Sequence, residues 1–171
     1  MKNRSAIIAT LEVQTRGETF VAHYSNSGLA RLDFPSAKKV KALPPSTPAV
    51  SRWHNLTRRA VTRALQGRPV GEIPPLDLAS GTKFQRQVWE ALRRIPAGRT
   101  ETYAQVAAAV GRPRAARAVG GSCGANPVPL LIPCHRVVAT GGGLGGFSGG
   151  LQWKMKLLAL ENRAAHRGQA A

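Results

Sequence analysis

The sequence predicts an α/β N-terminal domain, made of a small antiparallel sheet plus a helix, followed by a mainly α-helical C-terminal domain with a helix-turn-helix. Three observations support this fold class. β-branched and aromatic residues form three short runs before residue 35, separated by turn residues. Prolines then gather between residues 69 and 75 and indicate an extended connection. Beyond residue 82, apolar residues recur at helical spacing in segments that end at glycine or proline.

The domain boundary is expected in the proline-rich connection. We place an N-terminal domain over 1–80, which includes an extended linker at about 68–80, and a C-terminal domain over 81–163. The remaining residues, 164–171, are expected to form a flexible tail.

The N-terminal domain is expected to hold three strands and one helix. The strands are predicted at 7–13, 19–24 and 29–34, because these runs are rich in β-branched and aromatic residues. A basic, proline-rich loop is expected from Lys38 to Pro48. Apolar residues from Trp53 to Leu65 then follow a helical period, which predicts a helix.

The C-terminal domain is expected to contain several short helices. Thr82 is a capping residue for a first helix that Pro96 ends. A second helix is predicted over 102–110, and a third is predicted to begin at Arg112–Pro113. Two short helices joined by a turn with glycine favour a helix-turn-helix. A glycine-rich loop over 141–150 and a closing amphipathic helix over 152–160 complete the domain.

Charge is the strongest signal in the composition. The chain holds 25 Lys and Arg against 8 Asp and Glu, for a net charge of +17. The excess occurs in both domains, so a basic tail does not explain it. Such a field favours polyanions, which makes nucleic acid the expected partner. A cationic surface that serves only solubility, or an anionic membrane surface, stays open at this point.

The N-terminus and the cysteines indicate an intracellular protein. The apolar stretch from Ala6 to Leu11 is too short for a signal or a membrane span, so we expect a soluble, cytoplasmic chain. Two cysteines, Cys123 and Cys134, make no disulfide framework and too few ligands for zinc, so no metal is expected. Cys123 has no basic neighbour and is interpreted as a packing residue.

Cys134 is the candidate nucleophile. Only the thiolate is a good nucleophile, and a free cysteine has a pKa of about 8.5, so a base or a positive charge must be nearby. His135 is such a base, and Arg136 adds positive charge. Neighbours on an extended segment point to opposite faces, so we expect a water to bridge Cys134 and His135. The alternative is that Cys134 is an inert buried thiol.

The base needs an acceptor that orients it. Glu161 is the only carboxylate from Thr102 to the C-terminus, so an acceptor from this part of the chain must be Glu161. Glu90 and Glu101 are the alternatives, and both are expected at solvated helix edges.

The third predicted helix is unusual for a DNA reader. Helices that read the major groove carry Arg, Asn or Gln, whereas this helix offers Ala and Gly with Arg114 and Arg117. Small residues let a helix backbone approach a narrow groove, and an arginine could then fill the space left by an extruded base. Close helix packing, with the arginines on a solvated face, is the alternative.

Several motifs resemble the O6-alkylguanine–DNA alkyltransferase family, in the family's order over roughly residues 80–161. The Pro-Cys-His-Arg core with Asn-Pro before it is the most specific of them. The first 75 residues match in layout alone and resemble the family's RNase H-like domain, and the C-terminal domain is then winged-helix-like. The matching motifs are Phe84-Gln85-x-x-Val88-Trp89, Tyr103, Ala115-Ala116-Arg117-Ala118-Val119-Gly120, Asn126-Pro127, Pro133-Cys134-His135-Arg136-Val137 and Ser148-Gly149-Gly150.

The resemblance implies direct-reversal DNA repair without a cofactor. The family flips O6-alkylguanine out of duplex DNA and transfers the alkyl group irreversibly to a cysteine, so each molecule acts once. By their matches, Cys134 is the acceptor, and His135, a water and Glu161 form the relay that makes the thiolate. Tyr103 would donate to guanine N3, and Asn126 would brace the turn that leads to the cysteine. We expect a monomer in the cytoplasm, nucleoid-associated when bound to DNA; clustering along DNA stays open.

The resemblance also assigns contacts to DNA and to the lesion. Arg117 would intercalate, and the Ser148 N–H would donate to guanine O6, while the carbonyls of Cys134 and Val137 accept from the exocyclic amine. The expected DNA-binding residues are Arg117, Ala116, Ala118, Gly120, Arg112, Arg114 and Thr140. The expected substrate-pocket residues are Val137, Ser148, Phe147, Gly149, Leu144 and Pro129.

Three features depart from the family pattern. Phe147 stands where a tyrosine is common, which predicts altered affinity for lesions but not inactivity. The turn over 95–100 adds positive charge, expected near the DNA side. The zinc ligands of some N-terminal domains have no counterpart, because residues 1–80 contain no cysteine. Alkyltransferase-like proteins that only bind lesions lack the acceptor cysteine, so Cys134 argues against that function.

Overall fold

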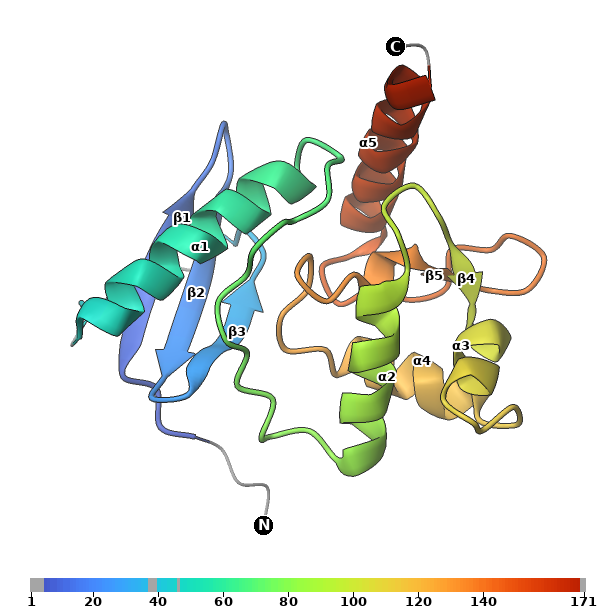
Figure 1. Ribbon diagram of the computed structural model, residues 1–171, viewed down its shortest axis with the longest axis horizontal. Coiled ribbons are helices and arrows are strands. Elements are labelled where there is room, and N and C mark those ends of the chain that lie inside the picture. Colours follow the sequence, from blue (N-terminus) through green and yellow to red (C-terminus); the bar gives the residue numbers. More distant parts are fainter. Residues whose placement is uncertain (1–4, 37–39, 46, 170–171) are drawn as a thin grey trace.

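An antiparallel sheet covered on one face by a helix forms the N-terminal part of the computed structural model, which describes residues 5–36, 40–45 and 47–169 (Figure 1). The strands are β1 (Ala9–Gln14), β2 (Thr19–Ser25) and β3 (Gly28–Asp33), in the spatial order β1-β2-β3. Buried and half-buried residues alternate along β2, as expected for a sheet with one face on the core. The predicted small antiparallel sheet is confirmed, although β1 begins two residues later than predicted.

Helix α1 (Pro48–Ala64) covers the sheet and begins earlier than predicted. Its first residue is Pro48, which lies where a missing backbone N–H costs nothing. The side chain of Thr47 accepts a hydrogen bond from the Val50 N–H and caps the helix. The predicted start at Trp53 was wrong because the prolines at 44, 45 and 48 favoured a loop, whereas Pro48 is the first residue of the helix.

The C-terminal part is mainly helical, as predicted. It contains α2 (Lys83–Arg94), α3 (Tyr103–Ala109), α4 (Ala116–Gly124) and α5 (Leu151–Gln169), with the two-residue parallel strands β4 (Glu101–Thr102) and β5 (Val137–Val138). Thr82 and Thr102 cap α2 and α3. In both caps a glutamine three residues on returns the hydrogen bond, which makes a capping box.

Two helix boundaries differ from the prediction. Helix α4 begins at Ala116 and not at Arg112–Pro113, because the residues before it form a turn in which the Ala115 N–H donates to the Arg112 carbonyl at 2.9 Å. Helix α5 continues to Gln169 and so includes most of the segment that was expected to be a flexible tail. Residues 170 and 171 of that tail lie outside the described residues.

The edge of β3 joins the N-terminal sheet to the rest of the chain. The Leu29 N–H donates to the Pro75 carbonyl at 2.8 Å, so the predicted linker runs along the sheet. Farther along the same strand, the Leu32 N–H donates to the Pro127 carbonyl at 2.9 Å. The Asn126–Pro127 turn, which lies beside the candidate nucleophile, is therefore held by the N-terminal sheet.

A group of aromatic rings continues this contact between the two parts. Phe34, directly after β3, packs against Phe20, Phe147 and Trp153 with ring centroids 5.1–5.6 Å apart. None of the helices in the described residues is long and apolar enough to cross a membrane. The RNase H-like and winged-helix-like descriptions stay predictions.

Candidate active site

The candidate nucleophile lies on a short turn. Residues Cys134–Arg136 form one turn of 3-10 helix, closed by a hydrogen bond from the Arg136 N–H to the Pro133 carbonyl at 3.0 Å. The expected extended segment is therefore wrong at this point, since proline and the buried turn before it bend the chain. All three side chains are buried, and Cys134 is 3% exposed.

The amide of Asn126 holds the thiol of Cys134. Its Nδ2 donates to the Cys134 Sγ at 3.1 Å and to the Ile132 carbonyl at 2.8 Å, while its Oδ1 accepts from the Val128 N–H at 3.0 Å. Burial raises the pKa of the Cys134 thiol, whereas the Asn126 hydrogen bond and the positive charge of Lys154 oppose this rise. The sulfur is thus a protonated thiol at neutral pH, and a base must take its proton.

His135 and Glu161 form a buried pair. The His135 Nε2 lies 2.9 Å from the Glu161 Oε1 on α5. Burial alone would raise the pKa of Glu161, but hydrogen bonds from His135 and Arg136 hold it at about 2, so the group is a carboxylate. Burial lowers the pKa of His135 although Glu161 raises it, so the imidazole is neutral.

The tautomer of His135 follows from this pairing. A carboxylate only accepts hydrogen bonds, so the imidazole proton is assigned to Nε2 and the lone pair to Nδ1. Among the described residues, the His135 Nδ1 is the one buried side-chain nitrogen or oxygen that has no hydrogen-bond partner. The side chain that follows Cys134 therefore has a free acceptor in the core.

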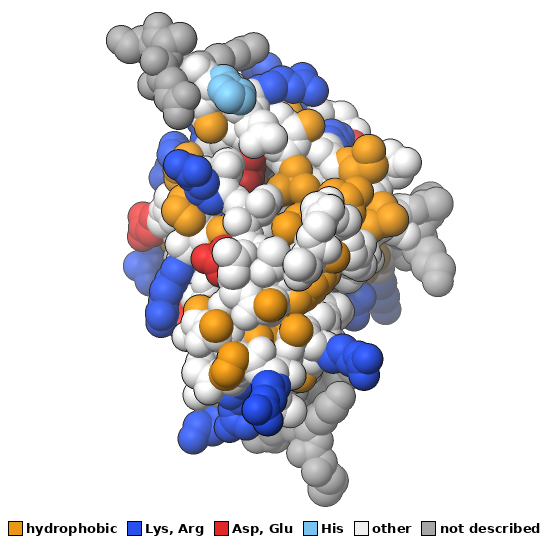
Figure 2. All heavy atoms as spheres, turned by 90° about the vertical axis from the view of Figure 1, so that its right-hand side faces the viewer, with side chains coloured by type: hydrophobic (Ala, Val, Ile, Leu, Met, Phe, Trp, Pro, Cys, Tyr) orange, Lys and Arg blue, Asp and Glu red, His pale blue; other side chains and the backbone are white. Residues whose placement is uncertain are grey.

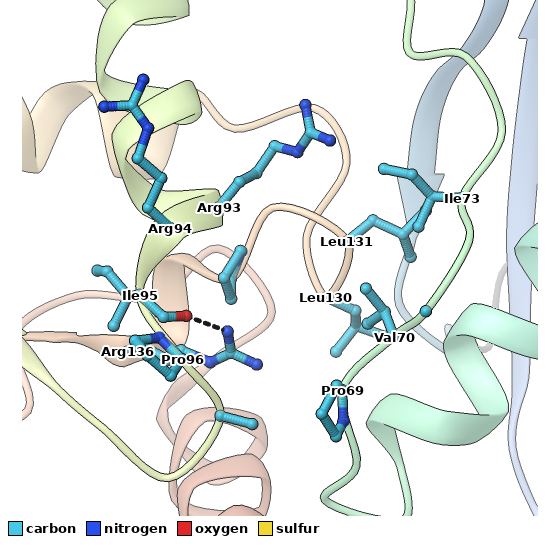
Figure 3. A pocket seen from close by; sticks show the side chains of 13 residues that line it. Pro69, Val70, Ile73, Arg93, Arg94, Ile95, Pro96, Leu130, Leu131 and Arg136 are labelled. Carbon is cyan, nitrogen blue, oxygen red and sulfur yellow. Dashed lines mark hydrogen bonds between the residues drawn. The ribbon is translucent and has the colours of Figure 1, made fainter.

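Arg136 differs from its expected role. It donates to both carboxylate oxygens of Glu161, at 2.8–3.2 Å, and to the Ile95 carbonyl at 2.5 Å (Figure 3). Because Glu161 compensates its charge, Arg136 orients the carboxylate and adds no net charge beside the thiol. The Gly98 N–H also donates to Glu161, at 3.1 Å. The turn over 95–100 therefore supports Glu161, a role that the sequence did not indicate.

The other carboxylates considered from the sequence lie elsewhere. Glu90 is exposed and pairs with Arg93 at 3.1 Å. Glu101 forms β4 and is half-buried. Within residues 5–36, 40–45 and 47–169, no three His, Cys, Asp or Glu side chains gather in a way that could hold a metal ion.

Tyr103 and the glycine loop, residues 141–150, lie side by side. Tyr103 is the first residue of α3 and is half-buried. Burial raises the pKa of its hydroxyl, and a hydrogen bond with the Gly146 backbone opposes this. Gly145 has a φ of 66°, and a Cβ built on it would overlap the Tyr103 hydroxyl. The close approach therefore requires glycine at this position.

Lys154 is the site residue that the sequence analysis missed. Its side chain is 0% exposed, although lysine is almost never fully buried. Its Nζ donates to the carbonyls of Val137, Leu144 and Gly146. A signal existed in the sequence, since positions 154, 157 and 161 fall on one face of α5, and Glu161 was already a candidate.

Four of the site residues predicted from the sequence line one cavity of about 400 Å³. It lies between the end of β3, the Asn126–Pro127 turn and the end of the glycine loop, and its lining includes Asn126, Pro129, Ser148 and Gly149. Cys134 does not line this cavity, although Asn126, which lines it, contacts the Cys134 Sγ.

The other predicted pocket residues do not line this cavity. Phe147 has its ring edge toward His135, with centroids 6.4 Å apart. Val137 is buried and Leu144 is half-buried, and both bind Lys154 through their carbonyls. Of the predicted set, Lys154 contacts Val137 and Leu144, whereas Pro129, Ser148 and Gly149 line the cavity.

A second cavity, of about 460 Å³, lies next to Arg136 (Figure 3). Its lining is mostly apolar and comes from the linker, the end of α2 and the segment before Cys134. None of the predicted pocket residues lines it. This cavity shares no lining residue with the cavity beside Asn126 and Ser148.

The predicted DNA-binding residues lie on and around α4. Ala116, Arg117, Ala118 and Gly120 belong to α4, and the Arg117 and Ala118 side chains are exposed. Three more residues lie in turns and are exposed: Arg112, Arg114 and Thr140. The Arg112 guanidinium lies 5.9 Å from the Phe84 ring centroid, a cation–π distance. The face with α3 and the glycine loop has apolar side chains in its middle and Lys and Arg around its margin (Figure 2).

Comparisons with known proteins agree on one family. A model described as the DNA binding domain of 6-O-methylguanine DNA methyltransferase matches residues 83–163. A methylated-DNA–protein-cysteine methyltransferase of Methanosarcina barkeri is 39% identical over 140 residues, which are 80% of this chain and 86% of that protein. The regulatory protein ada of Salmonella typhimurium is 44% identical over 128 residues, which are 75% of this chain but 34% of that protein.

A solved structure is similar over most of its length. The structure of Mycobacterium tuberculosis OGT in complex with DNA is 31% identical, has a TM-score of 0.72, and is matched over 90% of this chain and 91% of that chain. Together with the Methanosarcina relative, which is also matched over most of both chains, it covers both parts of the fold. The chain therefore belongs to the methylated-DNA–protein-cysteine methyltransferase family of DNA repair enzymes.

Proposed function

We propose that this protein transfers the alkyl group of O6-alkylguanine in duplex DNA irreversibly to Cys134, once per molecule and without a cofactor. One observation carries the proposal most strongly. The unpartnered His135 Nδ1 belongs to an imidazole whose other nitrogen is bound to the Glu161 carboxylate, and the preceding residue is the Asn126-bound thiol. Such a transfer needs a nucleophile, a base that takes its proton, and a group that orients the base.

The proton of the thiol moves first. His135 Nδ1 takes the Cys134 proton through a bridging water, as the family resemblance implies, and Glu161 stabilises the resulting imidazolium. The sulfur then attacks the alkyl carbon, an S–C bond forms, and the C–O6 bond breaks with its electrons on the guanine. Tyr103 donates a proton to guanine N3, and the proton on His135 is returned to the tyrosine through water. The net change is thiol plus alkylguanine to thioether plus guanine.

The lesion would be recognised by backbone groups of the Cys134 turn, β5 and the glycine loop. The Ser148 N–H donates to guanine O6, and the carbonyls of Cys134 and Val137 accept from the exocyclic amine. The Val137 carbonyl already accepts from Lys154 at 2.6 Å, but a carbonyl oxygen has two lone pairs and can accept again. The apolar walls given by Leu144, Phe147 and Pro129 suit a methyl or larger alkyl group.

The DNA would be held on its minor-groove side. The small side chains of Ala116, Ala118 and Gly120 let α4 approach the groove, and Arg117 enters the base stack in place of the flipped nucleotide. The turn residues Arg112, Arg114 and Thr140 contact phosphates. A protein that acts this way is expected to work as a monomer in the cytoplasm, associated with the nucleoid when bound to DNA.

Peptide mass spectrometry tests the acceptor directly. After incubation with duplex DNA that contains O6-methylguanine, the peptide with Cys134 is expected to gain one methyl mass, and the peptide with Cys123 none. Burial raises the pKa of Cys123 to about 12, which keeps that thiol protonated and makes it a suitable internal control. Methylation that persists in the Cys134→Ser variant would contradict the proposal.

A further inference from the structure

The charges buried around Cys134 do not all have a partner of opposite sign. Glu161 and Arg136 form an ion pair and compensate each other. His135 is neutral, as argued from its burial. Lys154 is then the one buried cation, among the residues that the structure describes, that is outside an ion pair.

The surroundings of the Lys154 Nζ select its charged form. Three carbonyls accept from it: those of Val137 at 2.6 Å, Gly146 at 3.5 Å, and Leu144. An ammonium has three N–H donors and can serve all three carbonyls, whereas a neutral amine has two. The same three bonds connect β5, directly after the Cys134 turn, to two points of the glycine loop.

The charge of Lys154 and the two nearby thiols affect each other's pKa. Burial lowers the pKa of Lys154, and negative charge on Cys134 or Cys123 would raise it. The reciprocal effect is that Lys154 lowers the pKa of both thiols and of His135. Cys123 stays protonated, and Tyr103, the other titratable group nearby, has its pKa raised by burial. The positive charge therefore favours ionisation of Cys134 in particular, because Asn126 also stabilises that thiolate.

We propose that Lys154 is a positioning residue with two linked roles: its ammonium holds the glycine loop against β5, and its charge stabilises the thiolate of Cys134 when the proton leaves. This rests on the proposed alkyl transfer. It assigns to Lys154 the positive charge that the sequence had assigned to Arg136, which is compensated by Glu161.

The pH dependence of thiol labelling separates the charge role from a purely structural one. In DNA-free protein, the rate at which iodoacetamide alkylates Cys134 follows the thiolate fraction. We expect Lys154→Met to move the midpoint of this rate profile up by about one pH unit, which is about a tenfold slower rate at pH 7. Lys154→Arg keeps the charge and should keep the midpoint within about 0.3 unit, on the same scale.

Lys156→Met is the matched control. It removes the same charge from the same helix, but Lys156 is exposed and pairs with Glu18 at 2.9 Å, so the midpoint should not move. If Lys154→Met does not fold, as judged by circular dichroism, Lys154→Gln replaces it, because glutamine is neutral and keeps two N–H donors. An unchanged midpoint in the folded neutral variant, or an equal shift in Lys156→Met, would overturn the proposal.

Repair of O6-methylguanine DNA, measured on the same variants, distinguishes this inference from the proposed function. If the wild-type protein does not methylate Cys134, the proposed function fails, whereas the labelling of DNA-free protein still tests Lys154. If the wild type repairs DNA and Lys154→Met repairs slowly with an unshifted labelling midpoint, Lys154 only braces the loop, and its role for the thiolate is refuted.

Discussion

At the scale of single residues, the Glu161 carboxylate connects three groups around the candidate nucleophile. It accepts hydrogen bonds from His135, from Arg136 and from the Gly98 N–H. These donors fix the carboxylate, and the carboxylate in turn fixes which nitrogen of His135 carries the proton. The orientation of His135 is therefore set by contacts within the protein alone. Its neutral state depends on burial, and its orientation depends on one acidic side chain on α5.

Glu161→Gln is expected to slow single-turnover transfer by about 100-fold, the upper range for loss of an orienting partner. Glutamine keeps the size of the side chain but removes the negative charge that stabilises the imidazolium. The rate of methyl transfer from excess O6-methylguanine DNA measures this, with Glu90→Gln, at an exposed surface pair, as the control. A loss of less than about threefold would indicate that His135 needs no carboxylate.

Glu161 also predicts how stability depends on pH. Its pKa falls from 4.5 to about 2 on folding, so its contribution is present above pH 4.5 and is lost as pH falls toward 2. The contribution is up to about 3 kcal/mol. Urea unfolding between pH 2 and 5 should show this loss in the wild type and a flatter profile in Glu161→Gln. Parallel profiles would mean that the ion pair does not persist in solution.

At the scale of elements, the glycine loop and the α3–α4 pair must fit around one tyrosine. Gly145 approaches the Tyr103 hydroxyl, and Gly120 on α4 lies beside the Tyr103 ring. The loop is in turn bound by Lys154 on α5. Elements that are distant in the sequence therefore share Tyr103 as a contact, and the position of its hydroxyl depends on all of them.

Gly145→Ala is expected to slow methyl transfer at least about tenfold, because the added Cβ displaces the Tyr103 hydroxyl and small misplacements of catalytic groups are costly. Gly142→Ala is the matched control. Gly142 also has a positive φ, 85°, so alanine costs about 1 kcal/mol of strain there too, but nothing lies within 4 Å of its Cβ. Equal losses in the two variants would show that loop strain, and not Tyr103, limits the rate.

Arg117→Ala should weaken repair in duplex DNA more than the reaction with free O6-methylguanine base, since only the duplex needs the extruded nucleotide replaced. Arg163→Ala, which removes an exposed arginine from α5, controls for the lost charge. Comparing single-turnover rates on the two substrates tests this. Equal losses on both substrates would argue against intercalation by Arg117.

At the scale of the whole molecule, the N-terminal sheet supports the Cys134, His135 and Glu161 group, to which it contributes no side chain. The Leu32 N–H donates to the Pro127 carbonyl, one residue from the Asn126 amide that binds the Cys134 thiol. Phe34 packs on Phe147, and a Cβ added at Gly149 would overlap the Phe34 ring. The net charge of +17 adds a long-range attraction for DNA that depends on salt. The sheet thus positions the residues around Cys134, and the net charge favours the encounter with DNA.

Local signals predicted much of this molecule. The caps at Thr82 and Thr102, the strand β2 and most helix positions follow from short-range patterns. The His135–Glu161 pair was predicted because Glu161 is the only carboxylate from Thr102 to the C-terminus. The burial of Lys154 and the pairing of Arg136 were missed, since both depend on which distant carbonyls and carboxylates fold against them. The start of α1 was missed because prolines favour both loops and helix N-termini.

The stoichiometry of transfer tests the central claim most directly. The protein is incubated with a tenfold excess of duplex DNA containing O6-methylguanine, and intact mass spectrometry follows it to completion. We predict that every molecule gains one methyl group, located on Cys134, and that the guanine released equals the amount of protein. Release of more guanine than protein, or a plateau with unmodified Cys134, would contradict the account.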